Sequence, residues 1–352
     1  MSAASQAYLN TRVSAMASRL PPAEAIVALI PASLSEIAER FGLQPLVEEN
    51  LPKRAKSRAA EQALIQVLFS DLRVLIRPMT PIERGLVLAW GRKYALFNLK
   101  TLIRGKLYDL DQAEIRTNLY DLPEHVRLPH QELFRAENVL ELLRTLEQGP
   151  YRLIARQARE VFEQKREPFA LEAAIDQRYY HELARLVMQF PSDNQQPLRT
   201  LLGILLDAVS LLWLLRFRLS YKLSPSETFY YLVPSFRLLH RDRLLQLVNL
   251  DGLEPLLAAL PTPLDEMMAG CTSIIDVQQR ISAYTADETR RLMAQSGSGV
   301  ARALGYLTLR ERQLFMLFSL IQGKLLGLPQ ELIEIGIEAA APHCPTDFAT
   351  AA

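Results

Sequence analysis

Two Gly-Lys pairs are the residues of this sequence that most resemble a site for chemistry. They lie in two similar segments, "NLKTLIRGKLYDL" (98–110) and "LFSLIQGKLLGL" (317–328). A phosphate-binding loop has the pattern G-x-x-x-x-G-K-[ST] after a strand, because its backbone N–H groups surround the phosphates and its hydroxyl holds Mg²⁺. Both segments lack the first glycine, and both have leucine where the hydroxyl residue belongs. The sequence therefore predicts no direct nucleotide binding at either pair.

Other patterns for catalysis or metal binding do not occur. No two histidines stand three or four residues apart, and neither H-E-x-x-H nor G-x-S-x-G is present. Cys271 and Cys344 form no C-x-x-C pair, which favours neither a zinc site nor a disulfide framework and fits a reducing cytoplasm. We therefore expect a non-catalytic protein with no catalytic residues, no cofactor and no metal. An enzyme whose site leaves no sequence pattern stays open as an alternative.

Composition and periodicity predict an all-α protein. Forty basic and 39 acidic residues give a net charge of +1, which indicates no nucleic-acid partner. Apolar residues recur every three or four positions, and no alternating stretch is sustained. The apolar segment 201–215 is shorter than the roughly 20 residues that span a bilayer, and Asp207 lies in its middle. We interpret it as a buried helix, and we expect the chain by itself to be soluble and to have no secretory signal.

Proline-containing segments divide the chain into helices. We expect loops at "RPMTP" (77–81), "YDLPEHVRLPH" (120–130), "QFPSDNQQP" (189–197) and "ALPTP" (259–263). The segment "SPSE" predicts a helix start, with Ser224 as the N-cap residue, Pro225 at the first position and Glu227 at the third.

A helical pattern recurs at three lysines, Lys106, Lys222 and Lys324, which are 116 and 102 residues apart. Positions −10, −7, −3 and +1 from each lysine are apolar, which places them on one helical face. These positions are Leu96, Leu99, Ile103 and Leu107; Leu212, Leu215, Leu219 and Leu223; and Leu314, Leu317, Ile321 and Leu325. A second stripe precedes each lysine helix, starting at Leu64, Ile175 and Ile281, although in the third copy its two middle positions are the threonines Thr285 and Thr289.

The second stripe and the lysine helix follow one another in the same order three times, which predicts three similar helical domains in tandem. Their expected bounds are 1–120, 121–235 and 236–340, and we expect residues 341–352 to form a disordered tail. Each copy is longer than the units of the common helical solenoids. Three equal copies favour a pseudo-threefold arrangement over an extended rod.

The lysines allow two interpretations. A cation near a helix C-terminus interacts favourably with the helix dipole, so the role can be purely structural. The alternative is a basic rim that meets a partner. On that alternative the candidate interface residues are Arg104, Lys106, Lys222 and Lys324.

Four segments resemble the C subunit of bacterial and archaeal V/A-type rotary ATPases, the counterpart of the d subunit of eukaryotic V-ATPase. They are "YLNTRVSAMASRL" (8–20), "WGRKYALFNLKTLIRGKL" (90–107), "LEAAIDQRYYHELARL" (171–186) and "FSLIQGKLLGLPQELI" (318–333). The most specific part is the cluster of Asn98, Lys100, Arg104, Lys106 and Leu107.

The resemblance implies a funnel of three helical domains on the cytoplasmic face of the membrane-embedded proteolipid ring. The funnel would receive the central stalk and pass torque between stalk and ring, for ion transport coupled to ATP hydrolysis or synthesis. The protein would be a non-catalytic part of the rotor, peripheral on the inner face of the membrane, with membrane contact only through the ring. The alternative is a soluble all-α scaffold or adaptor with unrelated partners.

Overall fold

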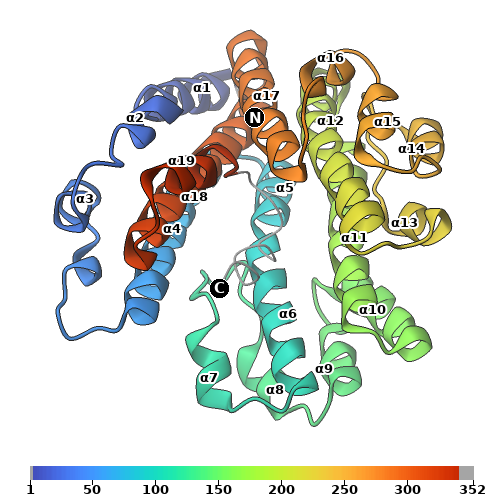
Figure 1. The fold of residues 1–352 in the computed structure, drawn as a ribbon, viewed down its shortest axis with the longest axis horizontal. Helices are drawn as coiled ribbons and strands as arrows, with labels where there is room; N and C mark the ends of the chain where they lie inside the picture. The colour runs from blue at the N-terminus through green and yellow to red at the C-terminus, as the bar shows by residue number, and fades with distance from the viewer. Residues whose placement is uncertain (1–2, 341–352) are drawn as a thin grey trace. The chain divides into compact units, whose positions relative to one another are not determined.

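The computed structural model describes residues 3–340 of the 352-residue chain, and every regular element in that range is helical (Figure 1). The predicted all-α class is confirmed. The described residues form two compact units, one of residues 3–83 and 190–340 and the other of residues 84–189. The division into three domains stays a prediction, and the predicted tail, 341–352, lies outside the described residues.

The first unit contains the N-terminal helices and all helices after residue 190. They are α1 (Ala3–Ala17), α2 (Ala23–Val27), α3 (Leu34–Phe41), the 3-10 turn η1 (Gln44–Leu46), α4 (Lys53–Ile76), α12 (Ser192–Leu215), the π turn η2 (Arg216–Ser220), α13 (Pro225–Tyr231), α14 (Arg241–Leu247), α15 (Leu253–Ala258), α16 (Leu264–Met268), α17 (Ile274–Gln295), α18 (Gly299–Leu326) and α19 (Gln330–Glu338).

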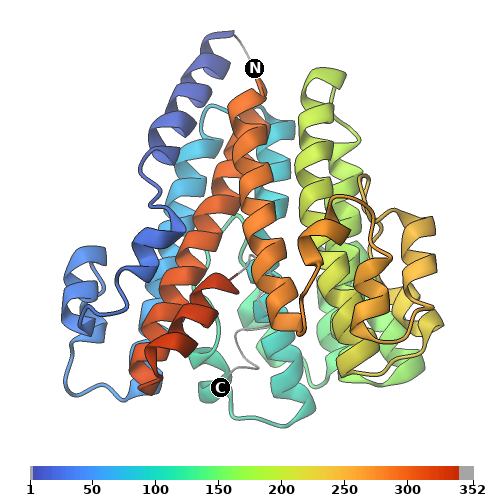
Figure 2. The ribbon, with the colours of Figure 1, turned by 45° about the horizontal axis from the view of Figure 1, so that its top comes forward.

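Helix α18 is the centre of this unit. It is 28 residues long, and α1, α4, α17 and α19 all pack against it; α4 runs beside it in both ribbon views (Figures 1 and 2). The Ser298 hydroxyl caps its first turn by accepting a hydrogen bond from the Ala301 N–H at 3.3 Å. Gly327 ends it with a φ of 74°, a left-handed conformation that glycine adopts without steric cost.

Helix α12 corrects one predicted loop. The segment 189–197 was expected to be a loop, but α12 begins at Ser192 and holds Pro197 inside the helix. A proline so near the start removes a single backbone hydrogen bond, and the buried side chains that follow outweigh that loss. The other three proline segments separate helices as predicted, with Pro81 and His130 as the first residues of α5 and α8.

In the described part of the chain, Ser192–Ser220 is the single helix long and apolar enough to cross a membrane. Of the most apolar 18 residues of this helix, 72% are buried inside the fold. Most side chains of 201–215 are buried, as expected for a core helix.

The second unit is built around α6 and α11. Its helices are α5 (Pro81–Gly91), which begins at the unit boundary, α6 (Lys93–Leu107), α7 (Gln112–Thr117), α8 (His130–Arg135), α9 (Val139–Leu146), α10 (Arg152–Lys165) and α11 (Pro168–Val187). Helix α11 packs against α10 and α6, and α6 also packs against α7 and α9. The Tyr179 hydroxyl donates to the Trp90 carbonyl at 2.8 Å, which ties α11 to the end of α5.

Candidate partner interface

The polar residues that begin the α6 cluster are buried and bonded inside the second unit. The Asn98 side chain donates to the Tyr120 carbonyl and accepts from the Tyr120 N–H, both at 2.8 Å. The Lys100 ammonium donates to both carboxylate oxygens of Asp176, at 2.7 and 2.9 Å. These two charged side chains are only 1% and 8% exposed. This part of the cluster therefore fixes α6 to α11 and to the chain that follows α7.

The two candidate interface residues on α6 also have internal partners. The Arg104 guanidinium donates from Nε and Nη2 to the two carboxylate oxygens of Glu172, each at 2.6 Å. That hydrogen-bonded carboxylate raises the pKa of Arg104 above its ordinary value. The Lys106 ammonium donates to the backbone carbonyls of Phe134, at 3.2 Å, and Ala136. Both cations hold the second unit together, in agreement with the structural interpretation.

Lys324 has the same kind of role in the first unit. Its ammonium donates to the Ile30 carbonyl at 2.6 Å and so ties the end of α18 to the segment after α2. Partial burial lowers the pKa of Lys324, and the nearby Glu36 carboxylate acts in the opposite direction.

Three turns of one design follow the long helices. In each, a residue with positive φ is followed by a leucine, then by the N-cap residue of a short helix. The positive-φ residues are Asp109 (51°), Lys222 (55°) and Gly327 (74°). The leucine N–H then donates back at 2.9 Å to a carbonyl of the preceding helix or, in the second turn, of the π turn: Leu110 to Gly105, Leu223 to Phe217, and Leu328 to Gly323. The short helices are α7, α13 and α19.

This geometry corrects the position expected for Lys222. The lysine spacing equates it with Lys106 and Lys324 near a helix end, but in the turn it occupies the place of Asp109 and Gly327. The π turn at 216–220 adds one residue between the helix carbonyl and the leucine, so the α-helical spacing fails there. Within the described residues Lys222 is exposed and forms no hydrogen bond or ion pair. The predicted helix start is confirmed, since Ser224 and Glu227 form a capping box.

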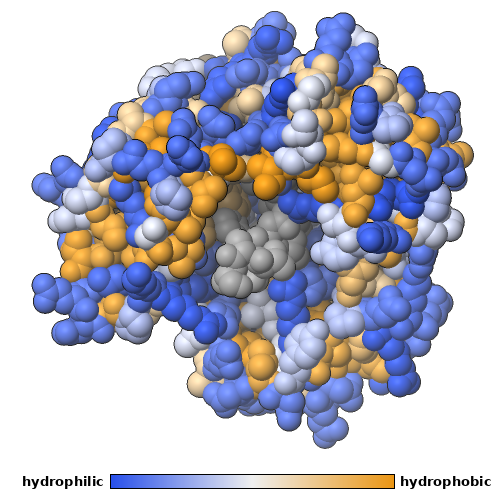
Figure 3. Space-filling model, viewed as in Figure 1, coloured by the Kyte–Doolittle hydropathy of each residue, from blue (hydrophilic) through white to orange (hydrophobic). Residues whose placement is uncertain are grey.

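An exposed apolar side chain precedes the positive-φ residue in all three turns. These side chains, which we call the turn residues, are Tyr108, Tyr221 and Leu326, and they are 64%, 57% and 53% exposed. Leu328, Leu332 and Ile335 extend the exposed apolar surface at the third turn. Figure 3 shows hydrophobic surface gathered over α19 and the adjoining end of α18. Large apolar side chains that gather outside the core are typical of a protein interface.

Sequence reasoning missed the turn residues because it searched for charge. A usable signal was present: a large apolar residue stands just before the residue that leaves the helix, next to a leucine and a helix-capping residue. That signal alone does not tell an exposed side chain from a buried one.

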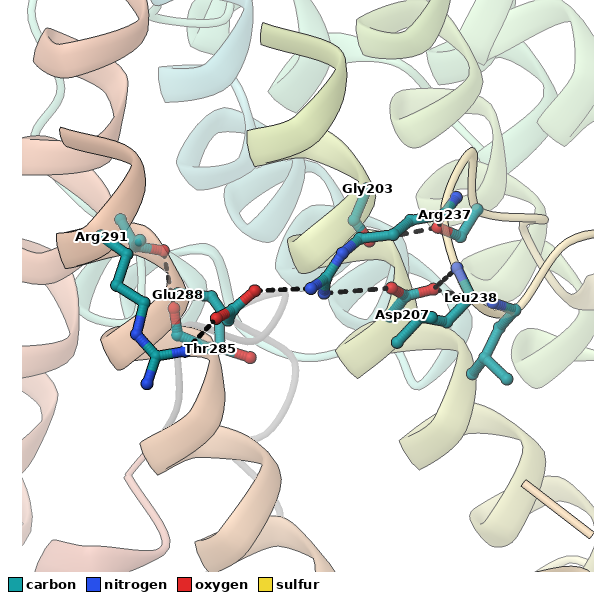
Figure 4. A network of polar contacts seen from close by, with 10 residues as sticks. Gly203, Asp207, Arg237, Leu238, Thr285, Glu288 and Arg291 are labelled. Atoms are coloured by element: carbon teal, nitrogen blue, oxygen red, sulfur yellow. Dashed lines mark hydrogen bonds and ion pairs between the residues drawn. The ribbon is translucent and has the colours of Figure 1, made fainter. Parts of the chain in front are cut away.

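One buried carboxylate outside these turns could suggest chemistry. Asp207 on α12 accepts hydrogen bonds from the backbone N–H groups of Leu238, at 3.2 Å, and Leu239, at 2.9 Å. Arg237 lies between it and Glu288 of α17, 3.8 Å from Asp207 and 2.5 Å from Glu288 (Figure 4). Burial raises the pKa of Asp207. The contacts of Arg237 and Asp207 cross-link α12, the 233–240 loop and α17, which gives the network a structural role.

The described residues contain no group of three His, Cys, Asp or Glu side chains that could hold a metal ion.

The family model for the ATP synthase (C/AC39) subunit matches residues 9–335 of the chain. The chain belongs to the C/AC39 family of ATP synthase subunits. Members of this family are non-catalytic accessory subunits of A/V-type ATPases. The resemblance of the sequence to the C subunit of V/A-type ATPases is therefore confirmed.

Similar proteins support the same assignment along almost the full length. The chain is 24% identical over 347 residues to the C subunit of the A-type ATP synthase of Methanocaldococcus jannaschii, which covers 93% of this chain and 84% of that protein. It is 24% identical over 349 residues to the C subunit of the A-type ATP synthase of Methanosarcina mazei, with 93% and 91% covered. As a C/AC39 subunit, the protein has the other subunits of a membrane-associated ATPase as its partners.

Proposed function

We propose that this C/AC39 subunit is the central-rotor socket of its ATPase, which joins the central stalk to the proteolipid ring and passes torque between them. On this proposal the protein lies at the cytoplasmic face of the membrane and reaches the membrane only through the ring. Three tandem helical domains with pseudo-threefold symmetry, arranged as a funnel, provide the body of the socket.

The observation that carries the proposal is the threefold recurrence of one turn with an exposed apolar residue at the same place. We propose that Tyr108, Tyr221 and Leu326 contact the proteolipid ring. A ring of identical subunits presents the same loop many times, so a partner with three like contact points matches it better than one with a single unique patch. The recurrence also supports the three-domain division, since the turns fall once in each of 1–120, 121–235 and 236–340.

The cations next to these turns then have two separate tasks. Arg104, Lys106 and Lys324 hold the helices that carry the turns, through the internal bonds described above. Lys222 is exposed and is the candidate for a charged contact with a partner. A charged contact at the edge of an interface contributes a salt-dependent attraction.

The experiment is purification of the tagged chain from membranes in mild detergent, followed by washes of rising salt and identification of the co-purifying chains. The proposal expects a small proteolipid and a stalk subunit, with a fraction that detaches at high salt. Recovery of ATPase subunits without any proteolipid would place the chain elsewhere in the complex. Recovery of unrelated partners alone would favour the scaffold alternative.

A further inference from the structure

A cavity of about 380 Å³ lies in the first unit between α1, the connection to α2, and the pair α17 and α18. Its lining includes the apolar residues Met293, Leu309 and Met316. It also includes the arginines Arg290, Arg302 and Arg312 of α17 and α18, and none of the lining residues is acidic. Neither the predicted rotor contacts nor the turn residues use this cavity.

Arg312 is the strongest reason to expect a ligand there. Its side chain lies on the cavity wall while the residue is only 8% exposed. Its one hydrogen bond within the described residues runs from Nε to the Ser282 hydroxyl at 2.9 Å, and no described carboxylate lies within 4 Å of it. Burial is the first cause that lowers the pKa of Arg312, and the positive charge of Arg290 adds to it. Buried arginines ordinarily have a carboxylate or another anion beside them.

A second guanidinium in the same cavity lacks an anionic partner. Arg302 donates from Nη2 to the Ser14 hydroxyl at 2.6 Å, and its buried Nε has no acceptor within the described residues. The nearby acids do not neutralise the pair. Asp287 is bound to Arg290 at 2.7 Å, and Glu24 acts on Arg312 only across a distance longer than an ion pair.

We propose that this cavity binds an oxyanion of the phosphate class, held by the guanidinium groups of Arg302 and Arg312. Two unbalanced guanidiniums match the charge of a phosphate monoester or of inorganic phosphate. The planar fork of arginine matches phosphate oxygens, and the burial of Arg312 strengthens a charged hydrogen bond from its guanidinium. The apolar lining residues can contact an organic group attached to the phosphate.

The test is isothermal titration of the full chain with inorganic phosphate, with sodium chloride at equal ionic strength as the reference. We expect saturable binding that Arg312→Gln weakens by roughly tenfold to a hundredfold, the range for a hydrogen bond to a charged group. Arg302→Gln should also weaken it. The matched control is Arg291→Gln, which removes an arginine of α17 that is 72% exposed and outside the cavity. That variant should bind phosphate as the unaltered chain does.

Thermal unfolding gives a readout that a purely structural arginine would not change. Phosphate should raise the midpoint of the unaltered chain and of Arg291→Gln, but not that of Arg312→Gln, because a ligand stabilises the state that binds it. Absence of saturable binding, equal binding by all variants, or an equal effect of chloride would overturn the proposal.

A competition arm identifies the source of the phosphate. Displacement of bound phosphate by glycerol 3-phosphate indicates a soluble ester, and displacement by vesicles containing phosphatidic acid indicates a lipid headgroup. Either result supports the oxyanion site.

Discussion

Gly105 and Ile115 are packed so closely that a Cβ atom on the glycine would lie 2.3 Å from Ile115 Cδ1. The first unit repeats this relationship at the other end of the chain, where a Cβ on Gly323 would lie 2.7 Å from Ile333 Cγ1. In both places the glycine lets the short helix after the turn lie directly on the long helix before it. The two Gly-Lys pairs, which resemble the end of a phosphate-binding loop, are thus packing sites between helices.

Gly105→Ala should destabilise the second unit by about 1–3 kcal/mol, the cost of an added group in a packed contact. Alanine favours helix by up to about 1 kcal/mol over glycine, so a net loss would show that the contact dominates. Each unit holds one tryptophan, Trp90 in the second and Trp213 in the first. In a Trp213→Phe background, tryptophan fluorescence during denaturation therefore reports on the second unit alone.

Gly85→Ala is the matched control for the close contact. It lies inside α5, and a Cβ there would meet nothing within 4 Å, so the change should stabilise or leave the unit unaffected. If Gly105→Ala behaved like Gly85→Ala, the close packing would not be a determinant of stability.

Lys100→Met should cost the second unit about 3–5 kcal/mol, because it removes the Lys100 ammonium from the buried Asp176 carboxylate. The double change Lys100→Met with Asp176→Leu should recover most of that loss, since a buried ion pair is often replaceable by apolar side chains. Trp90 fluorescence during urea denaturation measures the stability of the single and the double variant. A double variant as unstable as the single one would mean that Asp176 has a further essential contact.

The pH dependence of the first unit should report on Asp207. Burial raises the pKa of this carboxyl above its ordinary 3.8, so the folded state binds the proton more tightly than the unfolded state. The stabilisation is therefore fully present below pH 3.8 and is lost as the pH rises through the folded pKa. Relative to Asp207→Asn, the free energy of unfolding should fall across that interval and then level off.

The comparison with asparagine isolates this group, because the amide oxygen can still accept from the Leu238 and Leu239 N–H groups. Trp213 fluorescence in a Trp90→Phe background measures both chains across the acid range. A constant difference between the two at all pH values would contradict the raised pKa. Arg237 and Glu288, the charged groups that face Asp207, are unchanged in both chains.

How far the sequence predicts this molecule depends on how local the cause is. The helix start at Ser224 was predictable because capping uses residues three apart in the chain. The recurrent spacing of Lys106 and Lys324 was likewise predictable, since both end regular α-helices. The spacing wrongly equates Lys222 with Lys106 and Lys324 because a π turn inserts a residue. No residue type in 216–220 indicates such a turn.

The partners of the charged residues were not predictable at all. Lys100 and Asp176 are 76 residues apart, and Lys324 and Ile30 are 294 apart. Only the fold brings them together. The same holds for the arginine cavity, whose lining joins residues 14–23 near the start of the chain to residues 290–316 of α17 and α18.

Substitutions that place a charge on the turn residues should weaken their contact with the ring. Leu326→Asp should abolish or strongly reduce recovery of the proteolipid in the membrane pull-down, because it places a charge where an apolar contact is expected, and Tyr108→Asp and Tyr221→Asp should act in the same direction. The matched control is Leu245→Asp on α14, since Leu245 is 49% exposed and lies in no such turn. Lys222→Gln should leave thermal stability unchanged and make the chain detach at lower salt, because the residue has no internal partner to lose within the described residues. If Leu245→Asp reduced recovery as much as Leu326→Asp, or if all the turn variants kept the proteolipid bound, the three turns would not be the attachment points, and the contact would have to lie on other exposed surfaces of the two units.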